Sequence, residues 1–237
     1  MNSAPTTVGG GLDPRRPQIW VFNTTDSGFE SLADQGLASE EERKRASTLG
    51  VPAAARNLLA RRTAVRLVLG RHCSSDPVDL RFVTAPGGKP ILLPSSADRR
   101  TVSFSTGHSG DLYCIAVATS ASVGIDVELL RSVPRAQSIA RRWFGETEAR
   151  RLEADSADVL DVNFMRMWTA KEALAKRHGA GLRLMRGREG ELDIAAAEAK
   201  SLLRFFEPRS GYSAAIASTE VIDDIEVIRA GDDVWII

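Results

Sequence analysis

The sequence predicts an α+β fold. Stretches of helical character and stretches of strand character follow one another in separate blocks along the chain. Two of the strand-like segments also resemble each other, namely Tyr113-Cys-Ile-Ala-Val-Ala-Thr-Ser and Tyr212-Ser-Ala-Ala-Ile-Ala-Ser-Thr, and each lies near the end of one half, after a helix-rich part. A duplicated α+β unit explains this similarity, and so does a chance resemblance between two buried strands rich in Ala.

The composition restricts both the size and the partners of the protein. A chain of 237 residues allows one large domain or two small ones. The 31 basic residues balance the 31 acidic ones, so no overall field attracts nucleic acid or an anionic membrane. Cys73 and Cys114 do not suggest a disulfide framework, and no run reaches the ~18 apolar residues that a membrane span needs. We therefore expect a cytoplasmic protein with a disordered leader over residues 1–17.

The first half is predicted to begin with a strand and to continue with two helices. The aromatic and β-branched run 18–24 predicts the strand. Ser39, followed three residues later by Glu42, forms a capping-box pattern for a helix through residue 47, and Pro52 opens a second helix that extends to about residue 69. This second helix carries four arginines, which are Arg56, Arg61, Arg62 and Arg66.

Strands, helices and further strands are predicted for the remainder of the chain. Segments rich in β-type residues and separated by turns predict strands at 81–84, 101–106, 112–120 and 123–129. Helical character covers 138–154 and 161–179, where Gly179 follows basic residues and predicts the helix end. The last strands are predicted near 203–209, 212–218 and 232–237.

Two carboxylates lie in the otherwise apolar segment Val-Gly-Ile-Asp-Val-Glu, residues 123–128. In a strand, Asp126 and Glu128 project to one face, where like charges repel and each resists desolvation. A hard divalent cation such as Mg²⁺ would offset both effects. An edge strand whose acidic face lies in water explains the pair equally well, so this segment alone leaves the choice open.

A helix and a basic group supply further candidates. Trp168, Glu172 and Lys176 are spaced by four residues and share one helix face, where Glu172 could add a third carboxylate and Lys176 a charge for a phosphate oxygen. An ordinary surface pair at this spacing contributes only about 0.3–0.5 kcal/mol and is the other interpretation. The turn at His108 and Ser109 suits an anion better than nucleophilic catalysis, since no Gly-x-Ser-x-Gly motif occurs. Together with Lys89 and the arginines, these residues indicate metal-bridged pyrophosphate chemistry.

Four motifs then occur in a familiar order. They are Gly-Lys-Pro at 88–90, Phe-Ser-Thr-Gly-His-Ser-Gly at 104–110, Gly-Ile-Asp-Val-Glu at 124–128 and Trp-x-x-Lys-Glu-Ala-x-x-Lys at 168–176. In this order they resemble the 4'-phosphopantetheinyl transferases of the surfactin-synthetase-activating type. The chain length is similar to that of the two-lobed monomeric members, whereas the holo-acyl-carrier-protein synthases are much shorter.

The resemblance implies a fold and an activity. The fold would be a pseudo-two-fold pair of similar α+β lobes, residues 18–120 and 121–237, with the active site between them. The activity would be transfer of the 4'-phosphopantetheine arm of coenzyme A to a serine of an apo acyl or peptidyl carrier protein, with Mg²⁺ as cofactor and 3',5'-ADP as product. The protein would act as a monomer, and its partners would be coenzyme A and the carrier.

Residue roles also follow from the resemblance. The metal ligands would be Asp126, Glu128 and Glu172, and the residues acting in catalysis would be Asp126, Glu172 and Lys176. The residues expected to contact coenzyme A are Arg62, Lys89, His108, Ser109 and Lys176. Either Glu172 or a metal-held water would accept the proton of the serine.

Several alternatives stay open at this point. Gly107 stands where the family usually has Ser, which puts one hydroxyl contact in doubt. The contact to the 3'-phosphate could come from any of several basic residues, which are Arg43, Lys44, Arg56, Arg61 and Arg62.

A coenzyme A and carrier-binding protein without catalysis is the alternative function, and the carrier class is not determined. A two-carboxylate glycosidase fits less well, because its two acids normally flank the substrate from different elements. Residues 141–144 are either a carrier-docking segment or a solvated helix face.

Overall fold

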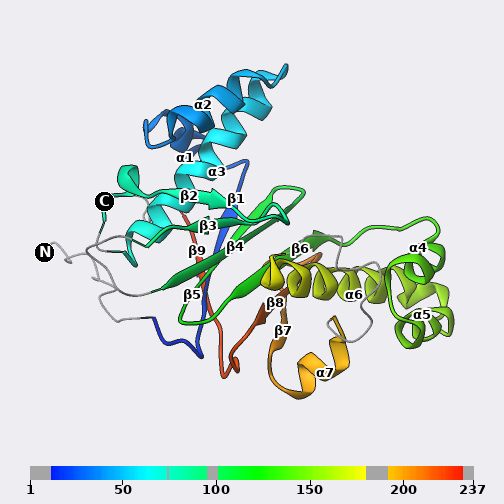
Figure 1. Ribbon diagram of the computed structural model, residues 1–237. Coiled ribbons are helices and arrows are strands. Elements are labelled where there is room, and N and C mark those ends of the chain that lie inside the picture. Colours follow the sequence, from blue (N-terminus) through cyan, green and yellow to red (C-terminus); the bar gives the residue numbers. More distant parts are fainter. Residues whose placement is uncertain (1–11, 74, 95–100, 180–191, 232–237) are drawn as a thin grey trace, which may run out of the picture.

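A computed structural model describes residues 12–73, 75–94, 101–179 and 192–231 and confirms the α+β class (Figure 1). The strands are β1 (Gln18–Asn23), β2 (Phe82–Thr84), β3 (Pro90–Leu92), β4 (Val102–Ser109), β5 (Leu112–Thr119), β6 (Val123–Leu129), β7 (Leu203–Phe206), β8 (Tyr212–Ser218) and β9 (Glu226–Arg229). The helices are α1 (Ser27–Ser31), α2 (Glu40–Ser47), α3 (Pro52–Gly70), α4 (Ala136–Trp143), α5 (Glu146–Glu153), α6 (Ala157–His178) and α7 (Ile194–Ala199), with 3-10 turns η1 (Leu32–Asp34) and η2 (Pro77–Asp79).

The described strands form three sheets. The largest has the order β4-β5-β1-β9, the second has the order β6-β8-β7, and β2 pairs with β3. All neighbours are antiparallel except β1 and β9, which run parallel. Strand β9 follows the strands of the three-stranded sheet in sequence but pairs with β1 of the four-stranded sheet. The four-stranded sheet therefore contains strands from both ranges expected as lobes, 18–120 and 121–237. The strand predicted at 232–237 lies outside the described residues.

Buried side chains divide the molecule into layers. One cluster lies between α3 and the four-stranded sheet and includes Phe22, Leu69 and Ile115. A second fills the space between the two larger sheets, and a third lies between the three-stranded sheet and α6. The order is therefore helix, sheet, sheet, helix, with α1 to α3 and α4 to α6 on opposite sides of the two sheets (Figure 1).

The two larger sheets meet along β4 and β6, which we call the serine seam. The side-chain oxygens of three β4 serines accept hydrogen bonds from β6 backbone N–H groups: Ser103 from Val123, Ser105 from Ile125 and Ser109 from Leu129. Gly107 continues this face of β4, where a Cβ atom would lie 3.1 Å from Asp126 Cα and 3.2 Å from Val127 N. The residue that departs from the family pattern thus stands where the two strands approach each other closely.

Local signals predicted several element ends correctly. Ser39 Oγ accepts from Glu42 N–H at 3.2 Å and Glu42 Oε2 accepts from Ser39 N–H at 2.7 Å, so the capping box of α2 is present. Pro52 opens α3, and Gly179 ends α6 with a φ of 71°. Of the leader expected to be disordered over residues 1–17, residues 1–11 lie outside the described residues. Residues 12–17 contact the rest of the protein, since Leu12 O accepts from Thr119 Oγ1 at 2.9 Å and Arg15 O accepts from Asp223 N–H at 2.9 Å.

Two local predictions were wrong. The helix expected over 138–154 is two helices, because Phe144 is extended and Gly145 starts α5 with a cap from Glu148 Oε2 at 3.0 Å. The turn expected at His108 and Ser109 is part of β4, where these residues pair with Tyr113 and Leu112. The turn between β4 and β5 consists of Gly110 and Asp111 alone. So short a turn is possible because Gly110 adopts the left-handed conformation with a φ of 55°.

Candidate active site

Gly124 allows α6 to lie directly on β6. A Cβ atom at this position would lie 2.0 Å from the carbonyl oxygen of Ala173 and 2.3 Å from the backbone nitrogen of Arg177. Asp126 and Glu128 share the strand face of Gly124, because side chains alternate along a strand. The close approach therefore brings these two carboxylates under the helix that carries Glu172 and Lys176.

Asp126 and Lys176 form the centre of the candidate site. Lys176 Nζ lies 2.8 Å from Asp126 Oδ1, and Asp126 is only 6% exposed. Burial raises the pKa of Asp126 to about 7, Lys176 opposes this shift, and the charges of Glu172 and Glu128 add to it. Asp126 Oδ2 is buried and has no hydrogen-bond partner among the residues that the structure describes. A buried carboxylate oxygen without a donor is costly, which indicates that this oxygen faces a ligand position.

Glu172 and Glu128 complete the acidic side of the site. Burial raises the pKa of Glu172, with Lys176 lowering it and Glu128 raising it. Glu128 Oε2 accepts a hydrogen bond from Ser109 Oγ at 2.7 Å. In the described part of the chain, no three His, Cys, Asp or Glu side chains are placed together so that they could hold a metal ion. The expected three-carboxylate metal site thus stays a prediction, although Asp126 Oδ2 fits a hard cation.

His108 lies within reach of two cations, Arg61 of α3 and Lys176 of α6. Partial desolvation lowers the pKa of His108, and the nearby charges of Arg61 and Lys176 lower it further. Arg61 lies over the ring of Tyr113, which is directly opposite His108 in β5. His108 is therefore close enough to both α3 and Lys176 for their charges to act on it.

The other predicted basic residues are distributed differently. Lys89 Nζ donates to the carbonyl oxygen of Val123 at 2.7 Å, and burial lowers its pKa to about 8. Arg56 forms a surface ion pair with Asp34 at 2.8 Å, and Arg43 donates to the carbonyl oxygen of Ala38. Arg56 and Arg43 are not among the described residues that line the cavity discussed next, and the contact to the 3'-phosphate stays a prediction.

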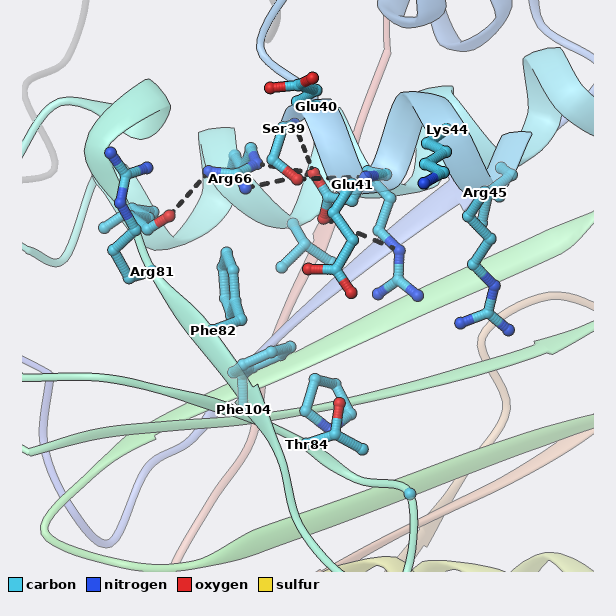
Figure 2. A pocket seen from close by; sticks show the side chains of 17 residues that line it. Ser39, Glu40, Glu41, Lys44, Arg45, Arg66, Arg81, Phe82, Thr84 and Phe104 are labelled. Atoms are coloured by element: carbon cyan, nitrogen blue, oxygen red, sulfur yellow. Dashed lines mark hydrogen bonds and ion pairs between the residues drawn. The ribbon is translucent and has the colours of Figure 1, made fainter. Parts of the chain in front are cut away.

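A cavity of about 710 Å³ opens between α2, α3 and the β2–β3 hairpin (Figure 2). Lys44, Arg45 and Arg62 line it, and Arg62 is held only loosely, at 3.9 Å from Glu42. Phe82 and Phe104 also line the cavity, and their rings contact each other edge to face with 5.7 Å between the ring centroids. Figure 2 shows Glu41 and Arg45 extending from α2 into this space. Cations beside aromatic rings suit a phosphorylated ring compound such as a nucleotide.

Several of these residues were not expected from the sequence to take part in the site. Phe82 and Phe104 were assigned to strands, and only the tertiary arrangement makes them cavity walls. Gly124 was quoted within a motif, but its role as the contact point of α6 depends on the packing. Trp168, expected beside Glu172, packs in an aromatic group with Trp143, Phe144 and Phe164 and so anchors α6 rather than facing a ligand.

Comparison with known proteins is consistent with this geometry. Residues 122–219, which contain β6, α6, β7 and β8, match the family model of the 4'-phosphopantetheinyl transferase superfamily. The chain is 32% identical over 167 residues to the Synechocystis protein slr0495, whose name assigns it provisionally as a 4'-phosphopantetheinyl transferase; the match covers 70% of this chain and 66% of the relative. The chain belongs to the 4'-phosphopantetheinyl transferase superfamily.

Two further members of the superfamily have similar sequences. The 4'-phosphopantetheinyl transferase HetI of Nostoc is 32% identical, with 66% of this chain and 65% of HetI covered. The 4'-phosphopantetheinyl transferase Sfp of Bacillus subtilis is 29% identical, with 69% of this chain and 75% of Sfp covered. The chain thus spans about two thirds of the length of slr0495 and HetI. Among the described helices, none combines the length and apolar character needed to cross a membrane.

Proposed function

We propose that this protein transfers the 4'-phosphopantetheine arm of coenzyme A to a serine of an apo acyl or peptidyl carrier protein. The observation that carries the proposal is the buried Asp126, which is paired to Lys176 through one oxygen and whose other oxygen has no hydrogen-bond partner in the described part of the chain. This arrangement lies within the part of the chain that matches the superfamily. The names of the relatives support the same activity.

The acidic residues would hold the cofactor. Asp126, Glu128 and Glu172 present only oxygen donors, which suits Mg²⁺. Their chemistry fits, because Asp126 Oδ2 is buried without a donor among the described residues, and because the neighbouring acidic charges raise the pKa of Asp126 and of Glu172. When bound, Mg²⁺ would offset the charge of the pyrophosphate.

The basic residues would hold coenzyme A. Lys176 lies beside the acids and would neutralise phosphate oxygens, with His108 next to it. Arg62, on the wall of the cavity, would face the 3'-phosphate, and Lys89 would lie near the nucleotide. Ser109 was also expected here, but its hydroxyl bonds to Glu128, so it contributes to the acidic side.

The reaction exchanges one phosphorus–oxygen bond for another. The carrier serine oxygen attacks the β-phosphorus of coenzyme A, and the bond from that phosphorus to the bridging oxygen breaks, so that 3',5'-ADP leaves. Glu172 would accept the serine proton, since its raised pKa makes the carboxylate a better base than an exposed one. Lys176 would stabilise the negative charge that develops on the leaving phosphate.

Mass spectrometry tests the proposal directly. The protein is mixed with Mg²⁺, coenzyme A and an apo carrier protein, and the carrier should gain the mass of one phosphopantetheine group. The gain should disappear when Mg²⁺ is replaced by a chelator or when Asp126 is changed to Asn. A panel of fatty-acid, polyketide and nonribosomal-peptide carriers would rank the substrates, and no gain with any of them would contradict the proposal.

A protein that binds coenzyme A and a carrier without catalysis is the second candidate. The observation in its favour is that the described residues contain no ready-made group of three metal-ligating side chains. Isothermal titration separates the two functions, because the second candidate requires coenzyme A binding in a preparation that transfers nothing.

A further inference from the structure

The hydroxyl of Ser109 lies between the two strands of the serine seam. Ser109 Oγ donates to Glu128 Oε2 at 2.7 Å and accepts from the backbone N–H of Leu129 at 3.1 Å. Because the Leu129 N–H occupies one lone pair, the hydroxyl proton is directed toward the carboxylate. Ser109 thus acts from β4 on a carboxylate that belongs to β6.

The two other seam serines show what this position does without a carboxylate. Ser103 and Ser105 lie on the same face of β4, and their hydroxyl oxygens accept from Val123 N–H at 3.3 Å and from Ile125 N–H at 3.2 Å. In these two bonds the donor is a backbone N–H group of β6, and the bonds join β4 to β6. Ser109 accepts a bond of the same kind and also donates a second hydrogen bond to Glu128. Because the first bond already joins the two strands, the second bond must have another role.

The end of β4 holds the Ser109 hydroxyl in a defined place. The residue after the β4–β5 turn glycine, Asp111, accepts from the Tyr212 hydroxyl through its side chain and from Thr24 N–H at 2.7 Å through its carbonyl. A Cβ atom on Gly110 would lie 2.6 Å from the Tyr212 hydroxyl oxygen, so Tyr212 packs closely against this turn. Tyr212 of β8 and Thr24, the residue after β1, therefore hold the strand end that presents Ser109.

We propose that Ser109 is a positioning residue that orients Glu128 for a divalent cation, an inference that rests on the proposed function. The hydroxyl engages Oε2, so Oε1 is the oxygen that would meet the cation. Partners of this kind change metal affinity by about 10- to 100-fold in other proteins.

Titration of the full chain with Mn²⁺ alone tests this role, because Mn²⁺ prefers the same oxygen ligands as Mg²⁺. Free Mn²⁺ is followed by electron paramagnetic resonance. Ser109→Ala should weaken binding by about 10-fold or more. Ser109→Thr, which keeps a hydroxyl, should restore it. Ser105→Ala is the matched control, because it removes a seam bond that does not involve a carboxylate, and it should leave Mn²⁺ affinity unchanged.

Each other outcome has a defined meaning. Equal Mn²⁺ affinity of wild type and Ser109→Ala overturns the inference, and so does an equal loss in Ser105→Ala, which would show that the seam alone matters. Coenzyme A affinity measured without metal should be unchanged in Ser109→Ala; a loss there would make Ser109 a ligand contact instead. A wild-type protein that binds Mn²⁺ but modifies no carrier contradicts the proposed function alone, and one that binds no Mn²⁺ overturns both.

Discussion

The acidic and basic sides of the candidate site are built in different ways. Asp126 and Glu128 are placed by backbone contacts, namely the approach of α6 to Gly124 and the seam bonds to β4. Two arginines of α3 are held by single ion pairs, Arg56 to Asp34 at 2.8 Å and Arg62 to Glu42 at 3.9 Å. The acidic side therefore depends on close packing of backbones, whereas these two arginines of the basic side depend on individual side-chain pairs.

The largest effect is expected at the contact point of α6. Gly124→Ala would put a methyl group into the helix backbone, so we expect the free energy of unfolding to fall by at least about 3 kcal/mol. Gly50→Ala is the control, since a Cβ atom at Gly50 would have no neighbour within 4 Å among the described residues. Chemical denaturation measures both variants. If the two unfold at the same denaturant concentration, the acidic side is not held by this packing.

Asp126 should make stability depend on pH. Its pKa rises from 3.8 in the unfolded chain to about 7 in the fold, so the folded state binds the proton more tightly. The free energy of unfolding should then fall as pH rises from about 4 to 7, by at most about 4 kcal/mol, and stay level above that. Asp126→Asn should remove this part of the pH dependence. An unchanged slope in the variant would mean that Asp126 is not responsible.

The basic side should respond to single charges. Arg62→Glu replaces a cation on the cavity wall by an anion and should weaken coenzyme A binding by about 10-fold, measured by calorimetry. Arg56→Glu makes the same charge change at a surface ion pair outside the cavity and should have little effect on binding. Similar losses in both variants would show that overall charge, rather than the cavity, attracts the ligand.

The smallest effect is expected on the carrier side. Arg141 and Arg142 are exposed on α4, where Arg141 pairs with Glu153 and Arg142 lies near the Trp143 ring. Changing both to Glu should reduce kcat/KM for an acidic carrier by a few fold and leave coenzyme A affinity unchanged. Arg150→Glu, on the neighbouring helix α5, is the control. Equal losses toward carrier and coenzyme A would exclude a docking role.

Much of the fold and part of the site could be predicted from the sequence, because they depend on local chemistry. The capping box at Ser39, the proline that opens α3 and the glycine that ends α6 are short-range signals, and the structure contains all three. The alternation of side chains along a β-strand predicts that Asp126 and Glu128 share one face, without any knowledge of the tertiary packing. The break at Gly145 was missed although its signal is local, because Glu148 caps Gly145 from three residues away. The extension of β4 through Ser109 was missed because pairing with β5 overrides the turn propensity there.

The sequence by itself determined the residue types of this site: carboxylates two apart in a strand, Glu172 and Lys176 four apart on a helix, and the motif order that resembles the superfamily. Only the tertiary structure decided which of these meet. In the fold, Lys176 pairs with Asp126, which lies 50 positions earlier in the chain. Arg56 forms an ion pair with Asp34 on the surface, and the hydroxyl of Ser109 donates a hydrogen bond to Glu128. The physical reason is that spacing along one element fixes only which side chains share a face, whereas contacts between elements depend on how closely their backbones approach. In this protein that distance is set by Gly124 and the serine seam.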